Sequence, residues 1–195
     1  MELRGERQLA ATRAVAWTAL NDTEMLKLCV PGCESLTARS ENSYEIVMNA
    51  AIGPVKSRFK GTVELADVDA PHGYTMKFDG SGGSAGFARG DVRVTLSDAP
   101  APETTQLAYV ATVQVGGKLA QVGSRLIDAA AGAMADKFFE AFDQRLRARA
   151  VAELEETTVH IDADLSRLME PVSFGFWSML KAFLRRLFSR RRPVV

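Results

Sequence analysis

The sequence predicts an α+β fold in which a curved antiparallel sheet of about seven strands wraps around one long C-terminal helix and leaves an apolar cavity. Three observations predict it. Apolar residues alternate with charged or small ones between residues 34 and 115, the period of strands with one solvated face. Short, turn-rich segments separate these runs, which favours hairpins over crossover helices. From residue 122 to 149, apolar residues recur every three or four positions, as along one face of a helix.

The N-terminal part of the chain predicts one strand and two short helices. Residues 2–9 alternate between charged and apolar side chains and predict the first strand. Thr12 can cap a helix over residues 13–20. A second short helix, over about residues 23–29, ends at Pro31, which is followed by a glycine.

The alternating runs supply the remaining strands. Turn-rich segments at residues 39–43, 69–73 and 97–104 separate several of them. The apolar positions of the runs are Tyr44, Ile46 and Met48; Phe59, Val63 and Leu65; Tyr74, Met76 and Phe78; Val92, Val94 and Leu96; and Leu107, Tyr109, Val113 and Val115.

The long helix follows a pair of glycines at residues 116 and 117. Its apolar stripe consists of Leu119, Val122, Leu126, Ile127, Ala130, Met134, Phe138 and Phe142. A sheet and a helix that diverge at one end can leave an apolar cavity between them. The stripe is core first of all, because periodicity does not separate the lining of a cavity from ordinary core.

Charge divides the chain into three parts. The formal net charge is zero, but residues 171–195 hold six basic residues and no acidic one, so the first 170 residues carry a net charge of −6. Residues 150–170 lose the apolar period and are acidic. We therefore expect a ligand-binding domain over residues 1–149, an acidic linker over residues 150–170 and a basic amphipathic tail over residues 171–195.

The tail has the pattern of a helix that lies in a membrane surface. Its apolar stripe is interrupted by basic residues and is shorter than the roughly 20 residues that a membrane-spanning helix needs. The expected membrane-binding residues are Phe176, Trp177, Leu180, Phe183, Leu184, Arg185, Arg186, Leu187 and Phe188. A helix docked on a partner protein remains the alternative.

Two glycine-rich segments do not predict a nucleotide site. Residues 80–90 lie between two expected strands, so no helix N-terminus is available to a phosphate. Lys118 follows two glycines, but Leu119 stands where a phosphate-binding loop needs Ser or Thr. An acidic domain also argues against a nucleic-acid groove.

The reactive side chains form no catalytic or metal-binding pattern. Cys29 and Cys33 supply two of the four ligands of a tetrahedral zinc site, and His72 and His160 are distant in sequence. The serines have no histidine near them in sequence. We therefore expect neither a catalytic residue nor a metal ligand, and we expect two free thiols in a reducing cytoplasm, because the N-terminus has no apolar signal segment.

Four segments resemble CoxG, the G subunit of carbon monoxide dehydrogenase. They are residues 29–36, with the sequence CVPGCESL; residues 53–61, with Gly53, Pro54, Val55, Arg58, Phe59 and Gly61; residues 83–90, with GSAGFARG; and residues 115–127, with VGGKLAQVGSRLI. The resemblance covers about residues 1–147. It implies the helix-grip fold of the START-like (SRPBCC) superfamily, in agreement with the predicted order of strands and helices.

The resemblance also implies a function. Such proteins accompany aerobic molybdenum-containing carbon monoxide dehydrogenases and related hydroxylases, which implies an accessory protein that brings the enzyme to the cytoplasmic membrane. It suggests that the cavity binds an isoprenoid quinone, menaquinone or ubiquinone, and that no covalent cofactor is present. The protein would then be cytoplasmic and peripheral on the inner face of that membrane, with the hydroxylase, the quinone and the membrane surface as partners and no nucleic acid.

The expected quinone-lining residues come from the sheet and from the long helix. They are Phe59, Phe78, Phe87, Tyr109, Val113, Leu119, Leu126, Ile127, Ala130, Met134 and Phe138. Two other functions stay open. One is an assembly or maturation factor for the same enzyme that binds no ligand. The other is an enzyme, since START-like proteins include cyclases and oxygenase subunits, although no acid–base pair can be placed in this cavity from the sequence.

Overall fold

The computed structural model describes residues 1–168, with the side chains of residues 1–152. Its contacts divide the chain into two compact units, Met1–Ala150 and Val151–Val195. The seven strands, the short helices and the first part of the long helix belong to the first unit. The expected membrane tail, residues 171–195, lies outside the described residues.

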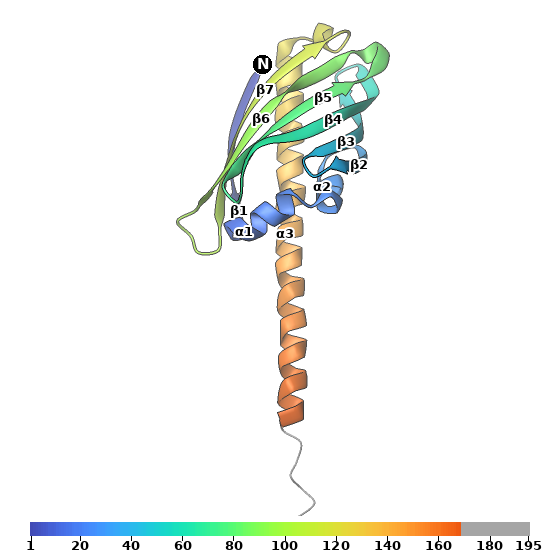
Figure 1. Ribbon diagram of the computed structural model, residues 1–195. Helices are drawn as coiled ribbons and strands as arrows, with labels where there is room; N and C mark the ends of the chain where they lie inside the picture. Colours follow the sequence, from blue (N-terminus) through green and yellow to red (C-terminus); the bar gives the residue numbers. More distant parts are fainter. Residues whose placement is uncertain (169–195) are drawn as a thin grey trace, which may run out of the picture. The chain divides into compact units, whose positions relative to one another are not determined.

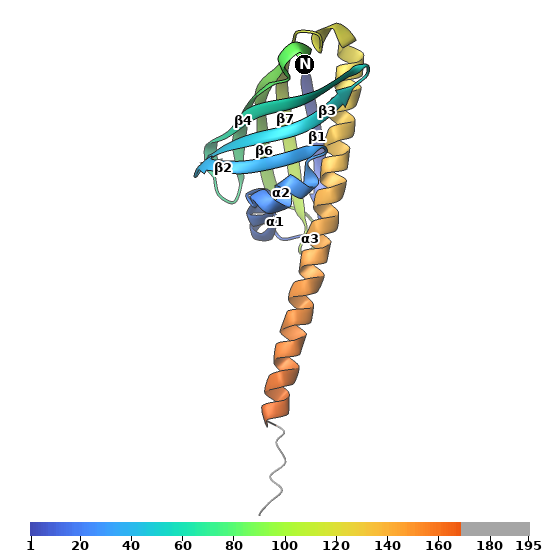
Figure 2. The same ribbon diagram turned by 90° about the vertical axis from the view of Figure 1, so that its right-hand side faces the viewer.

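The strands form one antiparallel sheet, as the sequence predicts (Figure 1). Their order across the sheet is β1-β7-β6-β5-β4-β3-β2, so the consecutive strands β2 to β7 form a meander and β1 closes its far edge. The strands are β1 (Glu2–Leu9), β2 (Cys33–Ser40), β3 (Ser43–Ile52), β4 (Val55–Asp69), β5 (Gly73–Ser81), β6 (Phe87–Asp98) and β7 (Thr105–Gly116). Figure 2 shows how strongly this sheet curves.

Two short helices close one end of the sheet (Figures 1 and 2). A side chain caps the N-terminus of each, and the cap of the first is the predicted one. In α1 (Arg13–Leu20), the Thr12 hydroxyl accepts a hydrogen bond from the backbone N–H of Val15 at 3.4 Å. In α2 (Thr23–Cys29), the Asp22 carboxylate accepts from the N–H groups of Glu24 and Met25 at 3.1 and 3.2 Å. Each cap satisfies donors that the first turn leaves free.

The long helix, α3, runs over Ser124–Leu168 and is preceded by the short 3₁₀ turn η2 (Ala120–Val122). The sheet curves around its first part (Figure 2). The helix continues past its predicted end near residue 149 into the acidic segment, which the sequence predicts to be a solvated linker with some helix. Glutamate and arginine favour helix even without a buried stripe, which explains the extension. Among the described residues, no helix is long and apolar enough to cross a membrane.

The tightest part of the core lies where α1, β1, β7 and α3 meet. Phe142 of α3 is 0% exposed, and Leu146, Leu9 and Leu107 are buried beside it. The buried hydroxyl at this junction is paired. The fully buried Thr105 hydroxyl donates to the carbonyl of Ala11 at 2.8 Å. This core holds α3 against one end of the sheet. Towards the N-terminus of α3, the helix and the sheet can therefore lie further apart.

The glycine-rich segment between β5 and β6 is a tight turn, η1 (Gly83–Ala85), packed against the end of β7. Gly86 has φ 112° and ψ −152°, a conformation open essentially to glycine alone. A Cβ added there would lie 2.0 Å from the carbonyl oxygen of Gly116. The close approach of two backbones, rather than a phosphate, therefore explains these glycines.

Gly86→Ala is expected to lower the free energy of unfolding by about 2–4 kcal/mol, because it adds a clash to backbone strain. Gly83→Ala is the matched control. Gly83 also has a positive φ, 60°, but a Cβ there meets no atom within 4 Å, so we expect a loss of about 1–2 kcal/mol. Urea unfolding of both variants checks the difference. Equal losses would show that the contact with Gly116 is unimportant.

Candidate ligand-binding cavity

An apolar cavity of about 470 Å³ lies between the concave face of the sheet and the first part of α3. This volume is within the range of about 300–1,000 Å³ that is usual for small-molecule sites. The lining comes from all seven strands, from the two short helices and their connections, and from α3. The residues are Met1, Leu3, Leu20, Asn21, Leu26, Val30, Pro31, Leu36, Tyr44, Ile46, Ile52, Val63, Leu65, Tyr74, Met76, Phe78, Ala88, Val92, Val94, Leu107, Tyr109, Ala111, Val113, Val115, Leu119, Ile127, Ala131, Met134, Ala135, Phe138 and Phe139.

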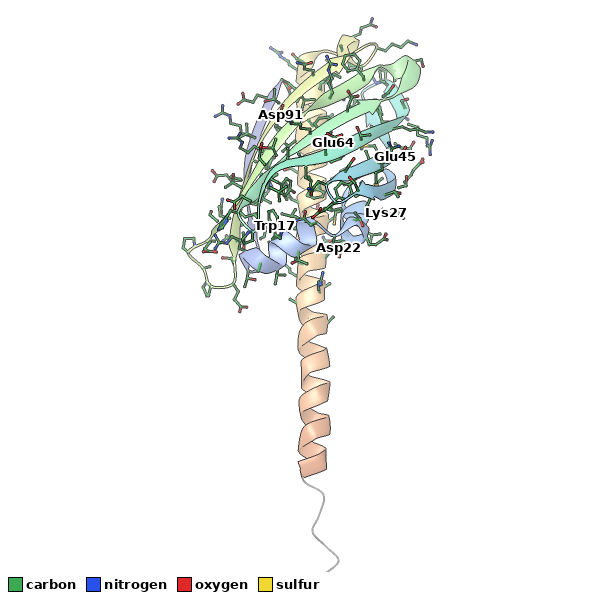
Figure 3. All side chains as sticks on the ribbon, viewed as in Figure 1. Trp17, Asp22, Lys27, Glu45, Glu64 and Asp91 are labelled. Atoms are coloured by element: carbon green, nitrogen blue, oxygen red, sulfur yellow. The ribbon has the colours of Figure 1, made fainter. Side chains whose placement is uncertain are left out.

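Alternation along the strands places these side chains. In β7, every second residue from Leu107 to Val115 lines the cavity. Residues of the opposite parity face solvent, as Glu64 of β4 and Asp91 of β6 do (Figure 3). The period of two in the sequence therefore separates the lining from the outer surface.

One face of α3 closes the cavity. Ile127, Ala131, Met134 and Phe138 follow one another at intervals of three and four residues, so they lie along one stripe. Phe139 continues the wall, and its ring stacks on that of Tyr109 with 5.5 Å between centroids. Alanines at two lining positions of the helix, 131 and 135, leave room that larger residues would fill.

A second lobe of about 210 Å³ adjoins the main cavity and shares Ile52, Phe78 and Met134 with it. Gly61 of β4 and Gly80 of β5 are paired across the two strands and lie in this lobe. Ala88 of β6 is the next partner along the same row. The lobe exists because three neighbouring positions on the concave face carry no side chain or only a methyl group.

The end of the cavity near α1 and α2 is formed by residues of the two helices and of the segments that follow them. Leu20, Asn21, Leu26 and Val30 line it. Trp17 of α1 packs edge-on against Tyr74 of β5, with 5.8 Å between ring centroids. This contact holds the phenol ring in place on the concave side of β5.

The lining carries no charged side chain. Its polar side chains are Asn21 and the chain's three tyrosines, Tyr44, Tyr74 and Tyr109. The Asn21 amide donates to the carbonyl of Trp17 at 2.8 Å. Burial raises the pKa of Tyr74 to about 12, with a smaller contribution from nearby Tyr44, so this phenol stays neutral at physiological pH. The cavity thus suits a neutral, mainly hydrocarbon ligand.

Seven of the eleven residues predicted to bind the ligand line the main cavity. They are Phe78, Tyr109, Val113, Leu119, Ile127, Met134 and Phe138. Phe59 lines the second lobe. Whether they bind a ligand stays a prediction.

The structure places the other three predicted residues outside the lining of both lobes. Phe87 is 38% exposed, since it has the opposite parity in β6 from Ala88, and its ring lies over Gly116 instead. Leu126 is 53% exposed and lies near Gly53 in the β3–β4 turn. Ala130 is one turn further along the same helix face as Leu126, and Ala131 takes the lining position.

The sequence reasoning missed two kinds of lining residue. Tyr44 and Tyr74 lie within alternating runs that the sequence predicts to be strands. Each is an even number of positions from other apolar residues of its strand, so the alternation places it on the cavity face. Leu20, Leu26 and Val30 carry no such signal, because an apolar residue on a short helix can face either core or cavity.

Cys29, Cys33 and His72 do not line the cavity. Cys29 is buried and Cys33 is partly buried, both with free thiols, and burial raises the pKa of each. His72 lies in the β4–β5 turn, 3.4 Å from the carboxylate of Asp69. Across the part of the chain that the structure describes, no three His, Cys, Asp or Glu residues come together as metal ligands.

The family of the chain follows from its sequence. The sequence model of CoxG, the G subunit of carbon monoxide dehydrogenase, matches residues 5–147, which contain nearly the whole sheet, both short helices and the cavity face of α3. The chain belongs to the carbon monoxide dehydrogenase CoxG family. This confirms the resemblance of the four segments. A comparison with curated proteins gives no match.

Solved structures place this CoxG family member in the START-like fold. A conserved protein from Geobacillus kaustophilus is 28% identical, with a TM-score of 0.71 over 76% of this chain and 96% of that one. A START superfamily protein from Mycobacterium smegmatis is 11% identical, with a TM-score of 0.57 over 75% and 97% of the two chains. An aromatase/cyclase from Streptomyces sp. R1128 is 11% identical, with a TM-score of 0.56 over 77% and 95%. The predicted helix-grip fold is thereby confirmed.

Proposed function

We propose that this protein is a non-catalytic quinone carrier and membrane adaptor for a molybdenum-containing carbon monoxide dehydrogenase or a related hydroxylase. It binds menaquinone or ubiquinone in its cavity and acts on the inner face of the cytoplasmic membrane. The observation that carries the proposal is an apolar main cavity without a charged lining side chain in a member of the CoxG family.

An apolar cavity would let a dehydrogenase in solution pass its electrons to a quinone that water does not dissolve. Oxidation of carbon monoxide together with water to carbon dioxide releases two electrons and two protons, and reduction of a quinone to a quinol takes up two of each. An isoprenoid quinone stays in the membrane because each methylene buried from water is worth about 0.8 kcal/mol. An apolar cavity offers the same environment outside the membrane, so the dehydrogenase can stay in solution.

The lining of the main cavity does not favour an enzyme. The aromatase/cyclase from Streptomyces shows that an enzyme can have this fold. General acid–base catalysis needs a titrating group near the reacting atoms. The main lining has no Asp, Glu, His, Lys, Arg or Cys side chain. Burial raises the pKa of Tyr74, which makes this phenol a poorer base or acid near neutral pH.

The basic tail supports the membrane part of the proposal. Residues 171–195 carry six basic and no acidic residues. Each basic residue near an anionic leaflet contributes about 1 kcal/mol, and inserted aromatic and leucine side chains add to this.

Truncation after Glu170 is expected to reduce sedimentation with phosphatidylglycerol vesicles more than tenfold. The truncated protein should still bind menaquinone-4, since the cavity lies within Met1–Ala150. Phosphatidylcholine vesicles serve as the uncharged control. Undiminished sedimentation of the truncated protein would contradict the role of the tail, and loss of menaquinone-4 binding would contradict the independence of the two parts.

A further inference from the structure

The cavity holds a phenol hydroxyl without a partner. Tyr74 is 8% exposed and lines the cavity from the first part of β5. Its hydroxyl makes no hydrogen bond with any residue that the structure describes. The hydroxyl oxygen is not among the fully enclosed polar atoms that lack a partner, so its O–H stays accessible to a molecule bound in the cavity.

The other two tyrosines of the cavity are placed differently. The Tyr44 hydroxyl donates to the carbonyl of Glu41 at 3.4 Å. The Tyr109 hydroxyl lies against the backbone of β1, only 2.4 Å from where a Cβ on Gly5 would be. Tyr109 thus reaches over the edge of the sheet, beside a glycine that leaves space for its hydroxyl. The Tyr109 hydroxyl likewise makes no hydrogen bond with any described residue, but it lies against β1, whereas Tyr74 lies beside Trp17 at the α1–α2 end of the cavity.

The surroundings of Tyr74 fix the direction of this donor. Trp17 packs edge-on against its ring and restricts its rotation. Val94 is its partner across the strands, and both residues line the cavity. The donor is therefore at the α1–α2 end. The second lobe at Gly80 lies six residues further along β5, or about 20 Å at the rise of a strand.

We propose that the Tyr74 hydroxyl donates a hydrogen bond to a carbonyl oxygen of the bound molecule and so holds its polar head at the α1–α2 end. The hydrocarbon tail then extends towards Leu119, Ile127 and the second lobe. The ligand class is a neutral ketone or quinone with a long hydrocarbon chain. This inference rests on the proposed function, and it adds which residue recognises the head group and in which direction the ligand lies.

The test uses the full chain and two probes. Menaquinone-4 carries two carbonyl groups, and squalene is a hydrocarbon without any polar atom. Tyr74→Phe is expected to weaken menaquinone-4 binding about five- to tenfold, the usual effect of one buried hydrogen bond, and to raise the infrared stretching frequency of one bound carbonyl. Squalene binding should not change, which also shows that the variant is folded.

Val110→Ala, at an exposed position of β7 outside the lining, is the control and should leave the affinity for menaquinone-4 and the carbonyl frequency unchanged. Tyr109→Phe removes the other lining phenol hydroxyl without a partner and tests whether the head group lies there instead. The assignment is overturned if Tyr74→Phe keeps the wild-type affinity for menaquinone-4 and the wild-type carbonyl frequency. It is also overturned if the carbonyl frequency shifts in Tyr109→Phe instead. In both cases the carrier function stands. A wild-type protein that binds neither probe would overturn the carrier function itself.

Discussion

Ala131→Trp is expected to reduce the affinity for menaquinone-4 at least tenfold without unfolding the protein. Ala131 lies on the cavity face of α3, between Ile127 and Met134 along the lining stripe. An indole at this position projects into the space that a ligand would occupy. Because much of that space is empty of protein atoms, we expect a smaller loss of stability than the 1–3 kcal/mol typical of overpacking in a filled core.

Ala133→Trp is the control for this substitution. Ala133 is on the same helix turn but is exposed, and it does not line the cavity. It should bind menaquinone-4 as the wild type does. Equilibrium titration of both variants, with thermal unfolding alongside, checks the result. If Ala131→Trp retains full affinity, the ligand is held elsewhere.

Phe142→Ala is expected to have the largest effect on stability, a loss of about 3–5 kcal/mol in the free energy of unfolding. Phe142 is 0% exposed and does not line the cavity, so its removal leaves a void in filled core. Its ring stacks on that of Phe138, with 5.7 Å between centroids, and joins α3 to the core cluster of α1, β1 and β7. A loss of this size is a large part of the 5–15 kcal/mol typical of a whole domain.

Val110→Ala provides the comparison. Val110 of β7 is 40% exposed, so this substitution should lower the free energy of unfolding by less than about 1 kcal/mol. The unfolding midpoints of both variants in urea give the measurement. A loss below 1 kcal/mol for Phe142→Ala would show that α3 is not held by this junction.

The sequence predicted the fold well because its two periods are strong. The period of two assigned the strands, and the period of three to four assigned the cavity face of α3 from Ile127 to Phe138. α3 continues past its predicted end because a helix rich in charged residues needs no buried stripe to continue. Pattern reasoning finds a helix most reliably while it packs against something.

The candidate site was predicted less well, and single-residue shifts explain most of the errors. Ala130 and Ala131 differ by about 100° around the helix, so one residue decides between the cavity and the surface. Phe87 and Ala88 differ by one position in β6, which reverses the face of the sheet. No sequence pattern could have shown that the Tyr74 hydroxyl lacks a partner, since this depends on residues from separate elements.

The glycines illustrate a further limit of sequence reasoning. Gly61 and Gly80 lie 19 positions apart in the chain, yet they are neighbours in the sheet and both line the second lobe. A Cβ on Gly80 would meet no atom closer than 3.6 Å, whereas a Cβ on Gly61 or Gly86 would lie 2.3 or 2.0 Å from a backbone carbonyl oxygen, so these two glycines serve close backbone contacts. The sequence marked the segment as unusual, but strand register was needed to tell which glycine makes room for a ligand.

The measurement that tests the carrier function most directly is native mass spectrometry, with organic extraction, of the full chain purified from a quinone-producing host. We predict a bound menaquinone or ubiquinone in the wild-type protein and its loss in Ala131→Trp. A wild-type protein that is reproducibly empty, and that does not take up added menaquinone-4, would contradict a quinone-binding cavity.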